Sequence, residues 1–257
     1  MNEKISQVNS MVIRKDETGT SMSNNTLLTF LLGIIFLSCS KNDGVLPPES
    51  ALSAYELEVI DYFKEIALGF EFGNASHITR KWNSDLRIYI GGVATTALLD
   101  ELEDILMEIN ELTSDGFRMN IVNDSLESNY YIFFGTGSDY ANIYPSQTNL
   151  INSNWGLFSV FWNGQNNFTS GHMYVDIVRA NPTEQKHLLR EELTQSLGLA
   201  QDSPLYAESI FQSAWTSTTE YASIDRDLIR LLYHPDMKVG LDESQVDSVL
   251  TAILMNE

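Results

Sequence analysis

Two amphipathic helices are predicted in the first half of the chain, because apolar residues recur there every three or four positions. A capping box formed by Ser53 and Glu56 begins the first helix, and Thr95 or Thr96 caps the second. The apolar face of the first helix consists of Val59, Tyr62, Phe63, Ile66 and Phe70. That of the second consists of Leu98, Leu102, Ile105, Leu106, Ile109 and Leu112. Each helix therefore carries an apolar stripe that must be buried against another element.

Strands are predicted where apolar residues come at every second position. Leu86, Ile88 and Ile90 follow this pattern, and two glycines at 91–92 end the strand. Further strands are expected at 117–122, 129–134, 157–162 and 172–178. The segment 135–156 is rich in Gly, Asn and Ser and is expected to be a loop.

A third long helix is predicted at about 182–198, with proline near its start and glycine at its end. Two shorter helices are expected at 223–233 and 242–254. The order of elements indicates a single α+β domain over residues 51–257. We expect a mixed, twisted sheet with two long helices and a small helical C-terminal part.

An apolar run from Leu27 to Leu37 precedes this region. A bilayer span needs about twenty apolar residues, so the run has the length of a signal-peptide core instead. It ends at Ser38-Cys39, which resembles the lipobox of bacterial lipoproteins, where the cysteine becomes the lipidated first residue. We expect a lipoprotein-type signal peptide at 1–38 and a tether at 39–50 lipidated on Cys39. The protein would then be anchored to a membrane of the bacterial cell envelope, in the periplasm or at the surface.

Charge and cysteine content narrow the classes of partner. The 257 residues have a net charge of −20. Residues 1–38 contain three basic and three acidic side chains, so residues 39–257 also have a net charge of −20. The electric field of this negative charge repels nucleic acid and anionic headgroups, and we expect no nucleic-acid partner. Cys39 is the only cysteine, which leaves neither a disulfide nor a cysteine-based zinc site.

The helix at 182–198 carries one charged residue among apolar ones. At 100° per residue, Glu192 falls within the arc formed by Leu188, Leu189, Leu193 and Leu197. A charge in that position is costly unless it is paired or opens into a cavity. Glu192 is therefore expected either to line a cleft or to form an ion pair with Arg80, Lys81 or Arg179.

This helix and the turn after it resemble the active-site helix of the metzincin metalloproteases. The stretch from Glu191 to Asp202 reads EELTQSLGLAQD, against the metzincin pattern His-Glu-x-x-His-x-Leu-Gly-Leu-x-His-Asp. Glu192 takes the position of the general base. The three zinc-ligand positions hold Glu191, Gln195 and Gln201 instead of histidine.

The resemblance implies a zincin-like fold in which positions 191, 195 and 201 converge on one point. It also implies that the strand at 172–178 is the sheet edge that holds a peptide, and that Ser209, with Asp202, is associated with the cleft. One carboxylate and two amides are a poor set of zinc ligands, so no cofactor is expected. His187 lies four residues before Glu191 and could approach the site, although a helix-surface histidine is usually solvated.

A broader resemblance covers most of the chain beyond the tether. It is carried by segments that include 80–82, 190–195, 197–199, 209–211 and 231–235. These resemble a bacterial family known as domain of unknown function 2927, whose members include lipoproteins and have no assigned activity. The resemblance supports the expected fold and location and implies nothing about a ligand.

Two functions compete on this basis, beside a purely structural role. The first is a non-catalytic envelope domain that keeps a zincin-like cleft for a peptide, protein or glycan partner, and the loss of all three zinc ligands favours it. The alternative is a hydrolase in which Glu192 acts with Glu191 or Asp202, with or without an oxygen-coordinated cation.

Overall fold

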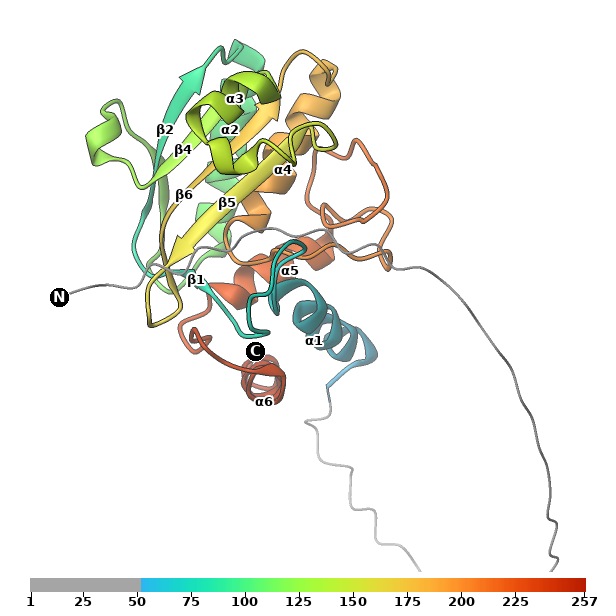
Figure 1. Cartoon of the computed structure of the whole chain (residues 1–257). Helices are drawn as coiled ribbons and strands as arrows, with labels where there is room; N and C mark the ends of the chain where they lie inside the picture. The colour runs from blue at the N-terminus through green and yellow to red at the C-terminus, as the bar shows by residue number, and fades with distance from the viewer. Residues whose placement is uncertain (1–51) are drawn as a thin grey trace, which may run out of the picture.

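A computed structural model describes residues 52–257 (Figure 1). The expected signal peptide, Cys39 and the tether lie outside the described residues. The helices are α1 (Ala54–Ala67), α2 (Thr96–Leu112), α3 (Gly137–Ile143), α4 (Pro182–Gln195), α5 (Ser223–Leu232) and α6 (Glu243–Leu254). The strands are β1 (Lys81–Trp82), β2 (Leu86–Gly92), β3 (Met119–Ile121), β4 (Tyr130–Gly135), β5 (Gly156–Trp162) and β6 (Asn167–Asp176). Short 3₁₀ turns lie at Ser125–Glu127 and Pro145–Gln147.

The strands form one mixed sheet in the order β1-β6-β4-β2-β3, with β5 paired to β6. All neighbours run parallel except β5, which is antiparallel to β6. Strand β5 therefore forms an edge of the sheet, and β6 lies inside it. The prediction that the strand at 172–178 is the edge was wrong. Strand order is a tertiary property, and the apolar pattern of β6 is equally typical of an edge strand and an interior one.

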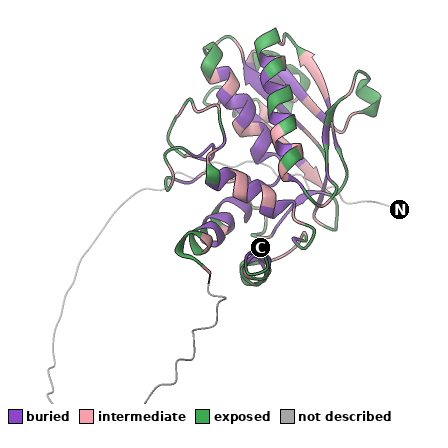
Figure 2. Ribbon diagram, turned by 180° about the vertical axis from the view of Figure 1, so that it is seen from behind, coloured by how far each residue is buried: buried purple, intermediate pink, exposed green. Residues whose placement is uncertain are grey.

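The two faces of the sheet are covered by different layers. Along β6, Met173 and Val175 join the main core, whereas Tyr174 joins a smaller cluster on the other face. Helices α2 and α4 pack on the first face, and α3 packs on the second (Figure 1). Figure 2 shows the result, with buried residues on the inner faces of the helices and exposed ones on their outer faces.

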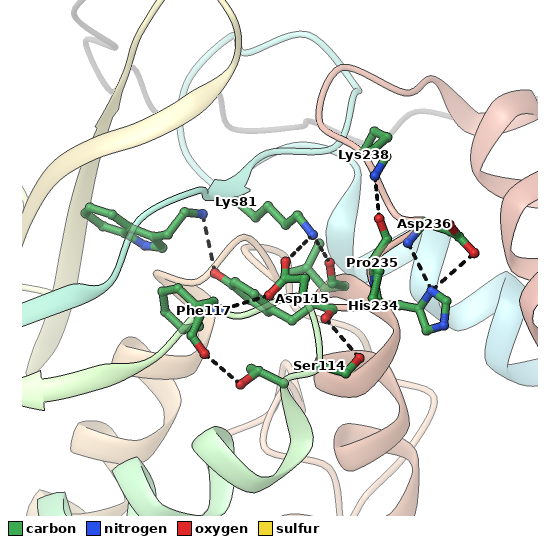
Figure 3. A network of polar contacts seen from close by, with 12 residues as sticks. Lys81, Ser114, Asp115, Phe117, His234, Pro235, Asp236 and Lys238 are labelled. Carbon is green, nitrogen blue, oxygen red and sulfur yellow. Dashed lines mark hydrogen bonds and ion pairs between the residues drawn. The ribbon is translucent and has the colours of Figure 1, made fainter.

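Helices α1, α5 and α6 pack together beside one end of the sheet (Figure 1). A hydrogen bond joins this helical part to β1, because the Lys81 ammonium donates to the Leu232 carbonyl of α5 at 2.9 Å (Figure 3). The same ammonium forms a buried ion pair at 2.7 Å with Asp115, which follows α2. Lys81 thus binds the C-terminal end of α5.

The single α+β domain and its main elements are confirmed. The capping box at Ser53 forms as predicted, and a second capping box at Asp242 begins α6. The segment 135–156 was expected to be loop but contains α3, whose first turn is capped by Thr136 and whose Tyr140 is fully buried. Seven residues are too few to show helical periodicity, so packing decides this helix. No helix within residues 52–257 is both long and apolar enough to cross a bilayer.

Candidate functional site

Helix α4 and the turn after it position the candidate site. Asn181 caps the helix and Pro182 occupies its first turn. The turn depends on Gly198, whose φ is +119° and where an added Cβ would lie 2.0 Å from the Arg80 carbonyl oxygen. Glycine is the residue that tolerates both constraints. The chain then passes along Asp202, which lines the same cavity as α4.

A cavity of about 710 Å³ lies between α4 and the edge strand β5. Glu191, Glu192 and Gln195 line it from α4, and the whole length of β5 lines it from the sheet. Residues 70–72 and 212–216 and several residues of 146–155 form the other walls. The cleft is therefore bounded by a helix, a strand edge and three connecting segments.

Strand β5 directs alternate backbone groups toward this cleft. The Asp176 N–H donates to the Trp155 carbonyl at 2.7 Å, which shows that these two residues form a hydrogen-bonded pair between β5 and β6. Hydrogen-bonded positions alternate along an antiparallel pair, so 157, 159 and 161 pair with β6. The N–H and C=O groups of Gly156, Phe158 and Val160 consequently point away from β6 to the edge of the sheet, where the Phe158 N–H hydrogen-bonds to Glu192.

The cleft is acidic. Glu71, Glu184, Glu191, Glu192 and Asp202 line it, and no Lys or Arg of the described residues does. The three cations expected as partners of Glu192 bind other groups. Lys81 pairs with Asp115 and Arg179 with Asp176. Arg80 donates to oxygens of Ser76 and Ile78. Of the two alternatives for Glu192, the cleft-lining one holds.

The carboxyl groups raise one another's pKa. Burial raises the pKa of Glu192 well above its usual range, and repulsion from Glu191, Glu71 and Asp202 adds to this. Burial, then Asp202 and Glu71, raise the pKa of Glu191 to about 8. Burial raises the pKa of Asp202 to about 6, against a hydrogen bond from Gln195. Part of the cluster is thus protonated at neutral pH.

His187 is buried in the cleft, with 3% of its side chain exposed. Its Nδ1 lies 2.7 Å from the Thr218 carbonyl oxygen. A carbonyl can only accept, so the neutral ring carries its proton on Nδ1. Burial lowers the pKa of His187, which favours that neutral ring. The lone pair of Nε2 therefore faces Glu191, whose Oε2 lies 3.3 Å away.

Not every position derived from the metzincin resemblance reaches the cleft. Gln195 lines it and donates to Asp202 at 2.6 Å. The Gln201 amide donates to the Leu68 carbonyl at 2.8 Å, and Gln201 is not among the residues that line the cavity. Ser209 is buried outside the cavity lining, where its hydroxyl donates to the Asp225 carboxylate at 2.5 Å.

These residues do not fit the zinc ion that a metzincin would hold. They offer one carboxylate and one amide oxygen in the cleft, with the second amide directed elsewhere. Among residues 52–257, no group of three or more His, Cys, Asp or Glu is arranged to bind a metal ion.

Sequence reasoning missed Trp215, which stands at the aromatic end of the cleft beside Trp155. Trp215, 58% exposed, lies on the loop at 212–216, and its ring centroid is 5.4 Å from that of Trp155 at an interplanar angle of 74°. The same ring is 6.1 Å from His187. An isolated tryptophan in a polar loop gives no local signal of a site, because its neighbours are distant in sequence.

Fold and site together define a mixed α+β domain with an acidic cleft between a strand edge and a helix that carries altered metzincin-like positions. The chain belongs to the family described as "Protein of unknown function (DUF2927)", which matches residues 56–252. No curated protein matches the chain.

Among solved structures, the chain is similar to two of myroilysin. The match to the first has 13% sequence identity and a TM-score of 0.37, and it covers 60% of this chain and 95% of the myroilysin chain. The match to the second has 12% identity and a TM-score of 0.37, and it covers 60% of this chain and 85% of the myroilysin chain. Likeness at this level carries no argument about chemistry.

Proposed function

We propose that this domain is a non-hydrolysing receptor of the cell envelope that binds an extended peptide segment along β5. The observation that carries the proposal is the β5 edge inside the cleft, toward which Gly156, Phe158 and Val160 direct their backbone groups. One of these groups, the Phe158 N–H, also meets the Glu192 carboxyl. An extended peptide satisfies such an edge by adding a strand, and pockets beside the edge then select its side chains.

The surroundings of the edge favour a peptide over a glycan. Sugars bind proteins on exposed aromatic faces, but Trp162 stacks on Phe70 with ring centroids 5.6 Å apart, and the Arg80 guanidinium lies 4.7 Å from its ring. Phe70 and Arg80 thus cover part of the Trp162 ring. Strand edges are usually blocked in soluble proteins, whereas this one opens into a cavity.

The chemistry of the cleft favours binding without zinc-dependent hydrolysis. The donor set is poor for zinc, which removes the usual route to an activated water. Burial raises the pKa of Glu192 well above its usual range, so at neutral pH this carboxyl is a weak candidate for a general base.

The lipid anchor belongs to the same proposal. Export and acylation at Cys39 would hold the domain at an envelope membrane, where its partners would be exported or membrane-bound polypeptides. The net charge of −20 would keep the domain itself away from anionic headgroups.

A second candidate function is a metal-free hydrolase. The specific observation in its favour is the pair of pKa values, about 8 for Glu191 and about 6 for Asp202. At neutral pH one carboxyl would be protonated and the other ionised, which is the arrangement of a general acid and a general base.

One experiment separates these functions. Purified protein is titrated with a library of acetylated eight-residue peptides, and enriched peptides are resynthesised with a single N-methyl group at each position. If the peptide adds a strand to β5, N-methylation should abolish binding at alternate positions only, because alternate N–H groups face the strand edge.

Mass spectrometry of the same peptides after prolonged incubation reports hydrolysis. Intact peptides with the alternating N-methyl pattern support the receptor. Cleaved peptides support the hydrolase, and uniform tolerance of N-methylation overturns the strand-edge mode.

A further inference from the structure

At the His187 end of the cleft, an imidazole nitrogen that can only accept faces a carboxyl group. The Nδ1 proton of His187 is used by the Thr218 carbonyl at 2.7 Å, so Nε2 is an acceptor. The atom that faces it, Oε2 of Glu191 at 3.3 Å, is also an acceptor when the carboxyl is ionised. His187 is almost fully buried, and two acceptors at this distance repel unless a donor enters between them.

One donor for this position is a proton on Glu191, which makes the carboxyl a donor to Nε2. The other is a group that enters the cavity, either water or a ligand. No Lys or Arg among residues 52–257 lines the cavity, so a cationic donor must come from a ligand. An ammonium group satisfies both acceptors and also supplies the positive charge that the surrounding carboxyl groups lack.

We propose that this end of the cleft is a subsite for a primary ammonium group, the side-chain amine of a lysine in the bound segment. The inference rests on the proposed peptide-binding function and names the residue that the peptide must carry.

The position of the subsite fits a peptide on β5. Glu192 packs directly against the strand edge, because a Cβ added at Gly156 would lie 2.6 Å from its Oε1. A side chain from a peptide residue beside Gly156 can therefore reach the carboxyl cluster. Trp155 and Trp215 stand at the same end, and both line the cavity. Aromatic rings beside a carboxylate stabilise an ammonium group further through cation–π attraction.

Binding of the ammonium group should release a proton. Without ligand, burial and the nearby carboxyl groups of Asp202 and Glu71 keep Glu191 largely protonated at neutral pH, with its pKa raised to about 8. Glu192 and Glu184 also line the cavity. When the ammonium enters, Glu191 becomes the carboxylate and its proton passes to solvent, so that the charge in the site stays balanced.

The test uses two pools of acetylated eight-residue peptides built from Ser, Thr and Val, one with lysine and one with norleucine at the fourth position. Norleucine keeps the aliphatic chain and lacks the amine. Each pool is titrated calorimetrically into the purified protein at pH 7, in two buffers of different ionisation enthalpy. We expect the lysine pool to bind about tenfold tighter or more, as for a charge-assisted hydrogen bond, and to release protons.

The matched variants are Glu191→Gln and Glu103→Gln. The first supplies a permanent amide donor to His187 and should erase both the lysine preference and the proton release. The second removes an equal charge from an exposed position on α2 and should leave both unchanged.

Equal affinity of the two pools for the wild-type protein would overturn the lysine subsite while the peptide-binding function stands. A lysine preference that survives in Glu191→Gln would place the ammonium elsewhere and also overturn it. If neither pool binds, the proposed function and this inference fall together.

Discussion

The Nε2 atom of His187 lies 3.3 Å from Oε2 of Glu191, one helical turn further along α4. Because Thr218 accepts the other ring N–H of His187, this contact needs a hydrogen from Glu191 or from a molecule that enters the cleft. In the metzincin pattern the position of Glu191 holds a zinc ligand. In this protein Glu191 instead faces His187, and the contact depends on a proton.

The first prediction concerns pH. In the folded protein, burial raises the pKa of Glu191 to about 8 and that of Asp202 to about 6, whereas both groups titrate near 4 in an unfolded chain (about 3.9–4.3). The folded state then holds more protons, so the stability contributed by these groups is complete below about pH 4 and lost by about pH 8. The free energy of unfolding in urea should therefore fall from pH 6.5 to 8.5.

Below about pH 6.5 the histidines oppose this trend, because burial lowers the pKa of His172 and His187 and protonation there favours unfolding. The variant Glu191→Gln should show a smaller decline and exceed the wild type above pH 8. Glu103→Gln should follow the wild type throughout. Identical slopes in all three proteins would contradict the assignment to Glu191.

The second prediction concerns Gly156→Ala. The new Cβ would lie 2.6 Å from Oε1 and 2.9 Å from Cγ of Glu192, and 3.0 Å from Cδ2 of Leu188. We expect a loss of roughly 1–3 kcal/mol in the free energy of unfolding, as in other overpacked sites. Urea denaturation measures it. Gly164→Ala is the control, because nothing lies within 4 Å of a Cβ there, and an equal loss in that variant would remove the steric explanation.

The third prediction concerns the buried carboxylate of Asp225. It accepts hydrogen bonds from the Ser209 hydroxyl at 2.5 Å and from the N–H groups of Ile210 and Ala222, both at 2.9 Å. These bonds tie the beginning and end of the loop that contains Trp215. Asp225→Ala removes the acceptor of these three donors, and the buried Ile210 N–H is left without a partner. We expect a cost of about 3 kcal/mol or more of unfolding free energy.

Asp236→Ala removes an exposed carboxylate and should change the stability by less than about 0.5 kcal/mol. A loss in Asp225→Ala as small as in this control would show that the loop is held by other contacts.

The fourth prediction concerns location. Cys39→Ser should abolish incorporation of labelled fatty acid and move the protein out of the membrane fraction, because the thiol is the attachment point that the lipobox resemblance implies. Labelling and fractionation measure the two effects separately. Unchanged labelling in this variant would refute the proposed anchor.

The elements of the fold were largely predictable because their signals are local. Capping residues such as Ser53 and Asp242 and the periodic faces of α1, α2 and α4 act within a few turns of chain. Helix α3 was not predictable, because its stability comes from burying Tyr140 against residues far away in sequence. The same holds for the two-residue strand β1.

The candidate site divides in the same way. The sequence by itself placed Glu191, Glu192 and Gln195 close together on one helix, because helical spacing suffices for that. It also showed that the zinc-ligand positions hold no histidine, because residue identity suffices for that. Only the tertiary structure decided that β5 is the edge strand, that Gln201 turns to Leu68, and that His187 is buried against Glu191. The physical reason is that strand order, burial and hydrogen-bond partners depend on chain segments that meet only after folding, whereas helix phase and capping are fixed by neighbours in sequence.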